Sequence, residues 1–110
     1  MNNQFNLTIG RDATGTYLNG YLDAGYKDIK KAFGNPSDAD GYKVDAQWTI
    51  TVNGKVITIY NYKDGVNYNG KKHGTPKTKI RDWHIGGNGN TMQESLFIAQ
   101  LVKGTYRNSY

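Results

Sequence analysis

The residues best suited to binding chemistry surround a glycine-rich turn, Gly86-Gly87-Asn88-Gly89-Asn90, between an expected strand and an expected helix. Small residues let backbone N–H groups approach a phosphate, and the positive end of a helix dipole favours an anion there. The pattern lacks both the GxGxxG spacing and the lysine of a P-loop, so a plain strand-to-helix connection is the competing interpretation. Asn88 and Asn90 are the candidate polar ligands from this turn.

Aromatic and basic residues near the turn extend the candidate set. Trp83 offers a ring for stacking on a base, although a core position is the competing interpretation. Arg81 and Arg107 suit bidentate phosphate contacts better than lysine does. His84 and Tyr60 complete the set of candidate ligand-binding residues.

Catalytic and metal chemistry find little support in the sequence. The chain has no Cys and only two histidines, His73 and His84, whereas a zinc site needs three or four such ligands. No serine lies in a nucleophile elbow, and no helix face pairs two carboxylates. We therefore expect a non-enzymatic protein with no metal and no cofactor.

Length and composition predict one small domain over residues 1–110. A chain of this size has a modest core, but nine Tyr and two Trp add buried aromatic area. The absence of Cys excludes a disulfide scaffold. No apolar run is long enough to span a membrane and no signal peptide is visible, so we expect a cytoplasmic protein with no membrane partner.

The net charge of +5 is concentrated in one region of the chain. Residues 41–82 carry eight bases and three acids, whereas residues 1–40 and 83–110 are almost balanced. A duplex-binding protein usually spreads its basic residues over a face or stripe. The sequence therefore argues against nucleic acid as the partner, and a solvated loop or a smaller anion fits the basic run at residues 63–81 better.

The clearest structural unit is a hairpin around Asn53-Gly54, because this dipeptide favours a type I′ turn between alternating strands. The turn sets a register in which Val52 faces Lys55 and Trp48 faces Ile59. One face of the hairpin is apolar and should enter the core. The other face carries Thr and Tyr residues, which suits either a solvated sheet face or a ligand platform.

The remaining elements complete an α+β fold: an antiparallel sheet built on hairpins, with two short helices. Asn19-Gly20 predicts a second tight hairpin between residues 16–18 and 21–22, and residues 5–9 alternate as a strand. Helices are expected over residues 26–33 and 92–103, with a Thr91 and Glu94 capping box starting the second. That helix is apolar nearly all round, which predicts a homo-oligomer that covers it. A long irregular loop is expected over residues 63–79.

Several segments together resemble the first type of Thoeris anti-defence sponge, a family of small phage proteins. They are Asp12-Ala13-Thr14-Gly15-Thr16-Tyr17-Leu18-Asn19-Gly20-Tyr21, Gly41-Tyr42-Lys43-Val44-Asp45, Trp48, Tyr60-Asn61-Tyr62-Lys63-Asp64-Gly65 and Trp83-His84-Ile85-Gly86-Gly87. The likeness covers roughly residues 7–104.

The resemblance implies a non-enzymatic α+β oligomer, a dimer or hexamer, in the cytoplasm of an infected bacterial host. Such a protein sequesters a cyclic ADP-ribose signal, blocks Thoeris immunity, and in some members also binds cyclic oligonucleotides. The family pocket uses aromatic, Asn and Arg side chains, whereas our candidate residues rest on their own chemistry. Two alternatives stay open: a nucleic-acid binder using the basic loop, and a protein-binding anti-defence inhibitor using the Tyr-rich sheet face.

Overall fold

The computed structural model describes residues 7–9, 16–37 and 43–109. The expected strand residues 5–6 lie outside them, as do residues 12–15 of the first segment that carries the resemblance. The elements in chain order are β1 (Leu7–Ile9), β2 (Tyr17–Asp23), α1 (Tyr26–Phe33), β3 (Gln47–Val52), β4 (Lys55–Tyr60), α2 (Val66–His73), the 3-10 helix η1 (Lys77–Lys79), β5 (Asp82–Gly87), α3 (Met92–Leu101) and β6 (Thr105–Asn108).

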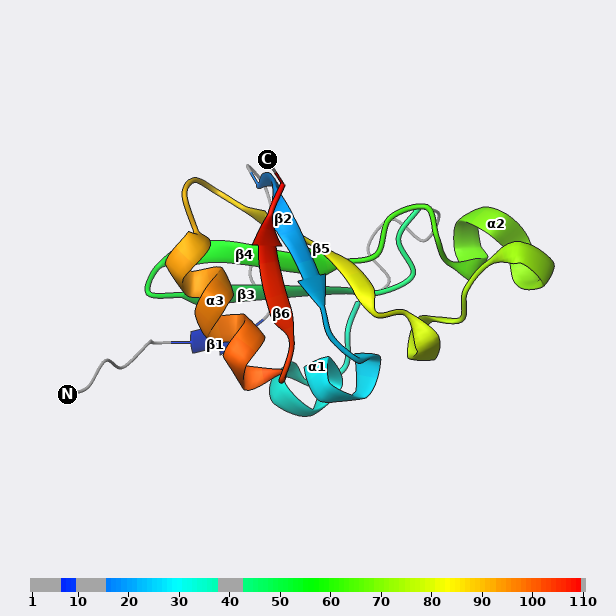
Figure 1. Cartoon of the computed structure of the whole chain (residues 1–110), viewed down its shortest axis with the longest axis horizontal. Coiled ribbons are helices and arrows are strands. Elements are labelled where there is room, and N and C mark those ends of the chain that lie inside the picture. Colours follow the sequence, from blue (N-terminus) through cyan, green and yellow to red (C-terminus); the bar gives the residue numbers. More distant parts are fainter. Residues whose placement is uncertain (1–6, 10–15, 38–42, 110) are drawn as a thin grey trace.

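The strands form one antiparallel sheet in the order β1-β3-β4-β5-β2-β6, which confirms the expected α+β class. Figure 1 shows β2 and β6 crossing steeply over β3 and β4, so the sheet is strongly twisted. In the same view α1 lies below the sheet, and α3 lies beside β6. The sheet order places β2 between β5 and β6, which come much later in the chain, so residues far apart in the sequence lie side by side on the sheet.

The β3–β4 hairpin has the predicted register. Val52 pairs with Lys55 and Trp48 pairs with Ile59, and both turn residues take positive φ, 51° for Asn53 and 82° for Gly54. These values are those a type I′ turn requires. The apolar face of the hairpin is buried, as expected.

The predicted hairpin at Asn19-Gly20 is wrong, because residues 17–23 form the single strand β2. The register against β5 shifts between Leu18 and Gly20, so the dipeptide makes a bulge instead of a turn. The Asn19 amide donates to the Gly89 carbonyl and to the Thr91 hydroxyl, at 2.9 and 2.7 Å. Gly20 leaves room for Tyr106 of β6, whose ring would lie 2.6 Å from an added Cβ.

Aromatic rings fill the core under the sheet. Trp48 and Trp83 meet edge to face at a centroid distance of 5.4 Å, and Tyr26 of α1 contacts both rings. The Trp48 indole donates to the Gly34 carbonyl and the Trp83 indole to the Ala24 carbonyl, at 2.8 and 3.0 Å. Each indole N–H is therefore satisfied while the ring area is buried, which compensates for the small number of aliphatic residues.

Residues 63–79 do not form the irregular loop that the sequence predicts. They contain α2, which is kinked at Gly70 with φ of 83°, and the short η1. Neither helical segment buries a residue, so no hydrophobic periodicity was available to reveal them. Within the described residues, no helix is long and apolar enough to cross a membrane.

Helix α3 occupies the predicted position but begins without the predicted capping box. Thr91 makes no side-chain cap, because its hydroxyl accepts from Asn19, and the Asn90 side chain accepts from the Met92 N–H at 3.2 Å instead. Ile98, Ala99 and Val102 join the core, while three apolar side chains stay 38–49% exposed on the outer side: Met92, Leu96 and Leu101.

Candidate functional site

A row of side chains crosses the face of the sheet opposite the aromatic core. Strand register places Gln47 beside Tyr60, Tyr60 beside His84, His84 beside Tyr21, and Tyr21 beside Arg107, on five neighbouring strands. The His84 ring lies 5.2 Å from Tyr21 and 5.4 Å from Tyr60, centroid to centroid. We call Tyr60, His84, Tyr21 and Arg107 the ring row.

Burial keeps the middle of the ring row uncharged. It lowers the pKa of the His84 imidazole below its usual value, and the Asp82 and Asp64 carboxylates offset part of that effect. Burial also raises the pKa of the Tyr60 hydroxyl, with further contributions from Tyr62 and Tyr21. At pH 7 the histidine and the tyrosine are therefore neutral, and they present flat, polarisable surfaces with polar edges.

Cations flank these neutral rings. The Arg107 guanidinium lies 4.3 Å from the centroid of Tyr21, and the Lys63 ammonium lies 5.3 Å from the centroid of Tyr62, whose ring contacts His84 at 5.8 Å. Both distances are typical of cation–π contacts. Neutral rings between two cations form a surface that suits a ligand with a flat ring and negative phosphates.

A shallow pocket of about 340 Å³ adjoins the Arg107 end of the ring row. Asp23, Arg81, Asp82 and Arg107 line this pocket. Arg81 is engaged with Asp23 through a 3.1 Å ion pair in which both side chains are more than half exposed. A phosphate reaching this pocket would exchange a weak, solvent-screened ion pair for a charge-assisted contact to arginine.

Three of the residues selected from the sequence therefore lie on the same face, namely Tyr60, His84 and Arg107, and a fourth, Arg81, lines the pocket at the Arg107 end. Trp83 requires a correction, because its side chain is fully buried between Tyr26 and Trp48. Alternation along β5 explains the difference: His84 points to the open face, so its neighbour Trp83 must point into the core.

Asn88 and Asn90 lie away from the ring row, in the turn between β5 and α3. Their side-chain oxygens accept from backbone N–H groups of Val56 and Met92, at 3.1 and 3.2 Å. Asn90 also lines a polar pocket of about 300 Å³ with Asn19 and Tyr106. The side chains of Asn88 and Asn90 thus stabilise the connection between β5 and α3. Neither of them lines the pocket that contains Arg81 and Arg107.

Two members of this surface were missed in the sequence. The hairpin predicted at Asn19-Gly20 includes Tyr21 and does not form, so the sequence does not indicate the position of Tyr21 beside His84. Tyr62 was placed on the polar face of the β3–β4 hairpin together with Tyr60, and that register could have identified it as a candidate.

Ring contacts dominate the surroundings of His84. Three tyrosine rings, those of Tyr21, Tyr60 and Tyr62, contact the His84 ring at centroid distances of 5.2, 5.4 and 5.8 Å. Among the described residues, no three His, Cys, Asp or Glu side chains gather closely enough to hold a metal ion. The fold and this surface together define a small α+β protein with a cation-flanked aromatic face. No protein-family model matches the chain, and no curated protein matches it.

Proposed function

We propose that this protein binds and sequesters a cyclic ADP-ribose-type nucleotide without altering it, acting as a phage anti-defence sponge against Thoeris immunity in the host cytoplasm. The ring row with its flanking cations is the observation that carries this proposal. The sequence resemblance supplies the ligand class, and the open face supplies groups of matching chemistry.

Each part of such a ligand has a counterpart on the face. An adenine ring can stack on Tyr60 or Tyr62, and base–aromatic stacking contributes about 1–3 kcal/mol per base. The phosphates can reach Arg107 and, after exchange with Asp23, Arg81. Neutral His84 can donate or accept a hydrogen bond to a ribose hydroxyl.

The outer side of α3 supports the homo-oligomer, a dimer or hexamer, that the sequence predicts. Leu96 is 49% exposed and Leu101 45% exposed, so this side holds apolar area that a second subunit would cover. A pocket of about 500 Å³ lies next to it, between α3 and β6, with Leu96, Phe97 and Tyr106 in its wall.

The proposal is tested by calorimetry of the pure protein against cyclic ADP-ribose isomers and cyclic dinucleotides. We expect stoichiometric binding, with unaltered ligand recovered after heat denaturation of the complex. Arg107→Ala should weaken binding at least tenfold, whereas Lys30→Ala, an exposed base on α1, should leave it unchanged. Absence of binding across the ligand panel would refute the sponge, and recovery of a modified ligand would make the protein an enzyme.

A protein-binding inhibitor remains the alternative use of the same tyrosine-rich face. It would form a tight complex with a host protein and release no heat with any of the small ligands.

A further inference from the structure

Residues 63–79, which we call the lobe, carry most of the charge of the protein. They contain Asp64 and five lysines, so their net charge is +4 out of +5 for the chain. Figure 1 shows α2 projecting beyond the end of the sheet. The five lysines are all exposed: Lys63, Lys71, Lys72, Lys77 and Lys79. The lobe is therefore a compact cationic projection.

A buried polar network attaches the lobe to the sheet. Asn61 is 0% exposed, and its side-chain oxygen accepts from the N–H groups of Asp45 and Ala46, at 2.7 and 3.0 Å. Its amide nitrogen donates to the Asp45 and Asp64 carboxylates, both at 3.0 Å. The only acid of the lobe thus points inward to Asn61, which leaves the lysines as its outward charge.

Two more hydrogen bonds hold the lobe in place. The Asn67 N–H at the start of α2 donates to the second Asp45 oxygen at 3.1 Å, and the Lys63 N–H donates to the Lys43 carbonyl at 2.8 Å. Because neither α2 nor η1 buries a residue, the lobe adds little to the core. The lobe is held in place by hydrogen bonds although it adds little buried apolar area. Its position is therefore fixed without a contribution to the core, which favours a role in binding.

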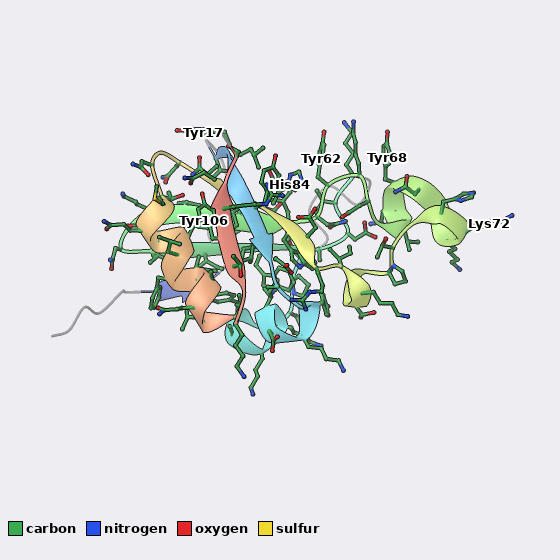
Figure 2. The ribbon with its side chains drawn as sticks, in the orientation of Figure 1. Tyr17, Tyr62, Tyr68, Lys72, His84 and Tyr106 are labelled. Atoms are coloured by element: carbon green, nitrogen blue, oxygen red, sulfur yellow. The ribbon has the colours of Figure 1, made fainter. Side chains whose placement is uncertain are left out.

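Two exposed tyrosines lie on one side of the lobe: Tyr62 directly precedes it, and Tyr68 belongs to α2. Tyr62 is 41% and Tyr68 37% exposed, and the Lys63 ammonium lies between them, 5.3 and 5.6 Å from their ring centroids. Figure 2 shows both rings pointing the same way, with Lys72 farther along α2. The arrangement alternates an aromatic ring, a cation and a second aromatic ring, followed by the lysines of the last turn of α2.

From this alternation we propose that the lobe binds single-stranded nucleic acid, with two successive bases on Tyr62 and Tyr68 and the backbone phosphates along Lys63, Lys71 and Lys72. Sequence-independent single-strand binding combines stacking rings with a cationic track in this manner. A duplex keeps its bases stacked inside, so it would use the lysines but not the rings. This proposal revises the sequence-based argument against nucleic acid, which concerned a broad duplex-binding face.

The experiment measures fluorescence anisotropy of a labelled oligothymidylate of about twelve nucleotides. Removing two charges by Lys71→Ala with Lys72→Ala should weaken binding about tenfold or more. It should also reduce the slope of log K against log salt by about 1.4, since single strands lose roughly 0.7 per phosphate contact. The matched control, Lys30→Ala with Lys31→Ala on α1, removes the same charge from another exposed helix.

Stacking is tested separately from charge. Tyr68→Ala should weaken binding about tenfold, whereas Tyr17→Ala, at a more exposed tyrosine outside the lobe, should not. An abasic strand of the same length should lose the dependence on Tyr68 and keep the salt dependence.

Three results would overturn the proposal: no binding at about 50 mM salt, equal losses in the control pair, or a polyglutamate peptide binding as tightly as the oligonucleotide. The last result would make the lobe a site for acidic proteins. Arg107→Ala should spare oligonucleotide binding, so failure of this proposal and failure of the sponge give different patterns.

Discussion

At the scale of single residues, Asn61 shows how much one amide can determine. It uses both lone pairs and both N–H groups inside the protein, at a fully buried position between the sheet and the lobe. Such a role is invisible in the sequence, because Asn61 follows a strand and resembles any turn residue. Its four hydrogen bonds, to Asp45, Ala46 and Asp64, depend on its three-dimensional position, so the sequence predicts residues of the site more readily than the network that supports the lobe.

Asn61→Ala should lower the free energy of unfolding by about 2–4 kcal/mol, because it removes the acceptor of two buried N–H groups and the donor to one oxygen of the buried Asp45 carboxylate. Urea unfolding followed by tryptophan fluorescence measures this loss. Asn35→Ala, at an exposed position, is the matched control and should change the free energy by less than about 0.5 kcal/mol. Equally small losses of unfolding free energy in both variants would show that the Asn61 network does not stabilise the fold.

His84 makes a second prediction at this scale. Because its pKa is lowered in the folded state, the unfolded chain takes up its proton more readily, beginning near the usual value of about 6.5. Above that pH the titration of His84 does not change the free energy of unfolding. As the pH falls below it, the titration of His84 lowers the free energy of unfolding increasingly. Urea midpoints at pH 7, 6 and 5 should fall more steeply for the wild type than for His84→Gln. The exposed His73→Gln is the control, and parallel profiles for His84→Gln and wild type would contradict the prediction.

At the scale of elements, two Asn-Gly dipeptides behave differently. Asn53-Gly54 closes a hairpin because the residues on its two sides pair with each other. The residues around Asn19-Gly20 pair instead with β5 and β6, which come much later in the chain. Local turn chemistry predicts the first correctly, whereas the second is decided by distant partners. For that reason the sequence predicts Tyr60 and His84 as site residues but not Tyr21, although strand register places all three side by side.

Helix α3 gives the prediction that belongs to this scale. If its outer side is a subunit contact, Leu96→Lys with Leu101→Lys should shift the protein to monomers without loss of helical signal. Light scattering after size exclusion measures the mass, and circular dichroism measures the helix. Gln100→Lys adds a charge on the same exposed side and should have the smaller effect. A wild-type protein that is monomeric at about 100 μM would contradict the expectation.

At the scale of the whole molecule, apolar burial is divided unevenly. The sheet, α1 and α3 hold the core, whereas the lobe is attached through hydrogen bonds. We expect hydrogen exchange to be faster in α2 and η1 than in β4 and β5, because elements with few buried contacts open at lower free energy. Asn61→Ala should accelerate exchange in α2 more than in β5. Uniform protection across the chain would show that the lobe and the sheet open as one unit.

The sheet order also has a consequence for biosynthesis. Leu22 of β2 pairs with Trp83 and with Tyr106, so both neighbours of β2 are made long after β2 itself. While the ribosome is still translating the lobe, β2 has neither partner, and its backbone donors and acceptors remain available to other chains. Pairing over such sequence separations is slow compared with local hairpin closure. A nascent chain stalled before residue 82 would thus have a folded β3–β4 hairpin beside an unpaired β2, the species most exposed to aggregation.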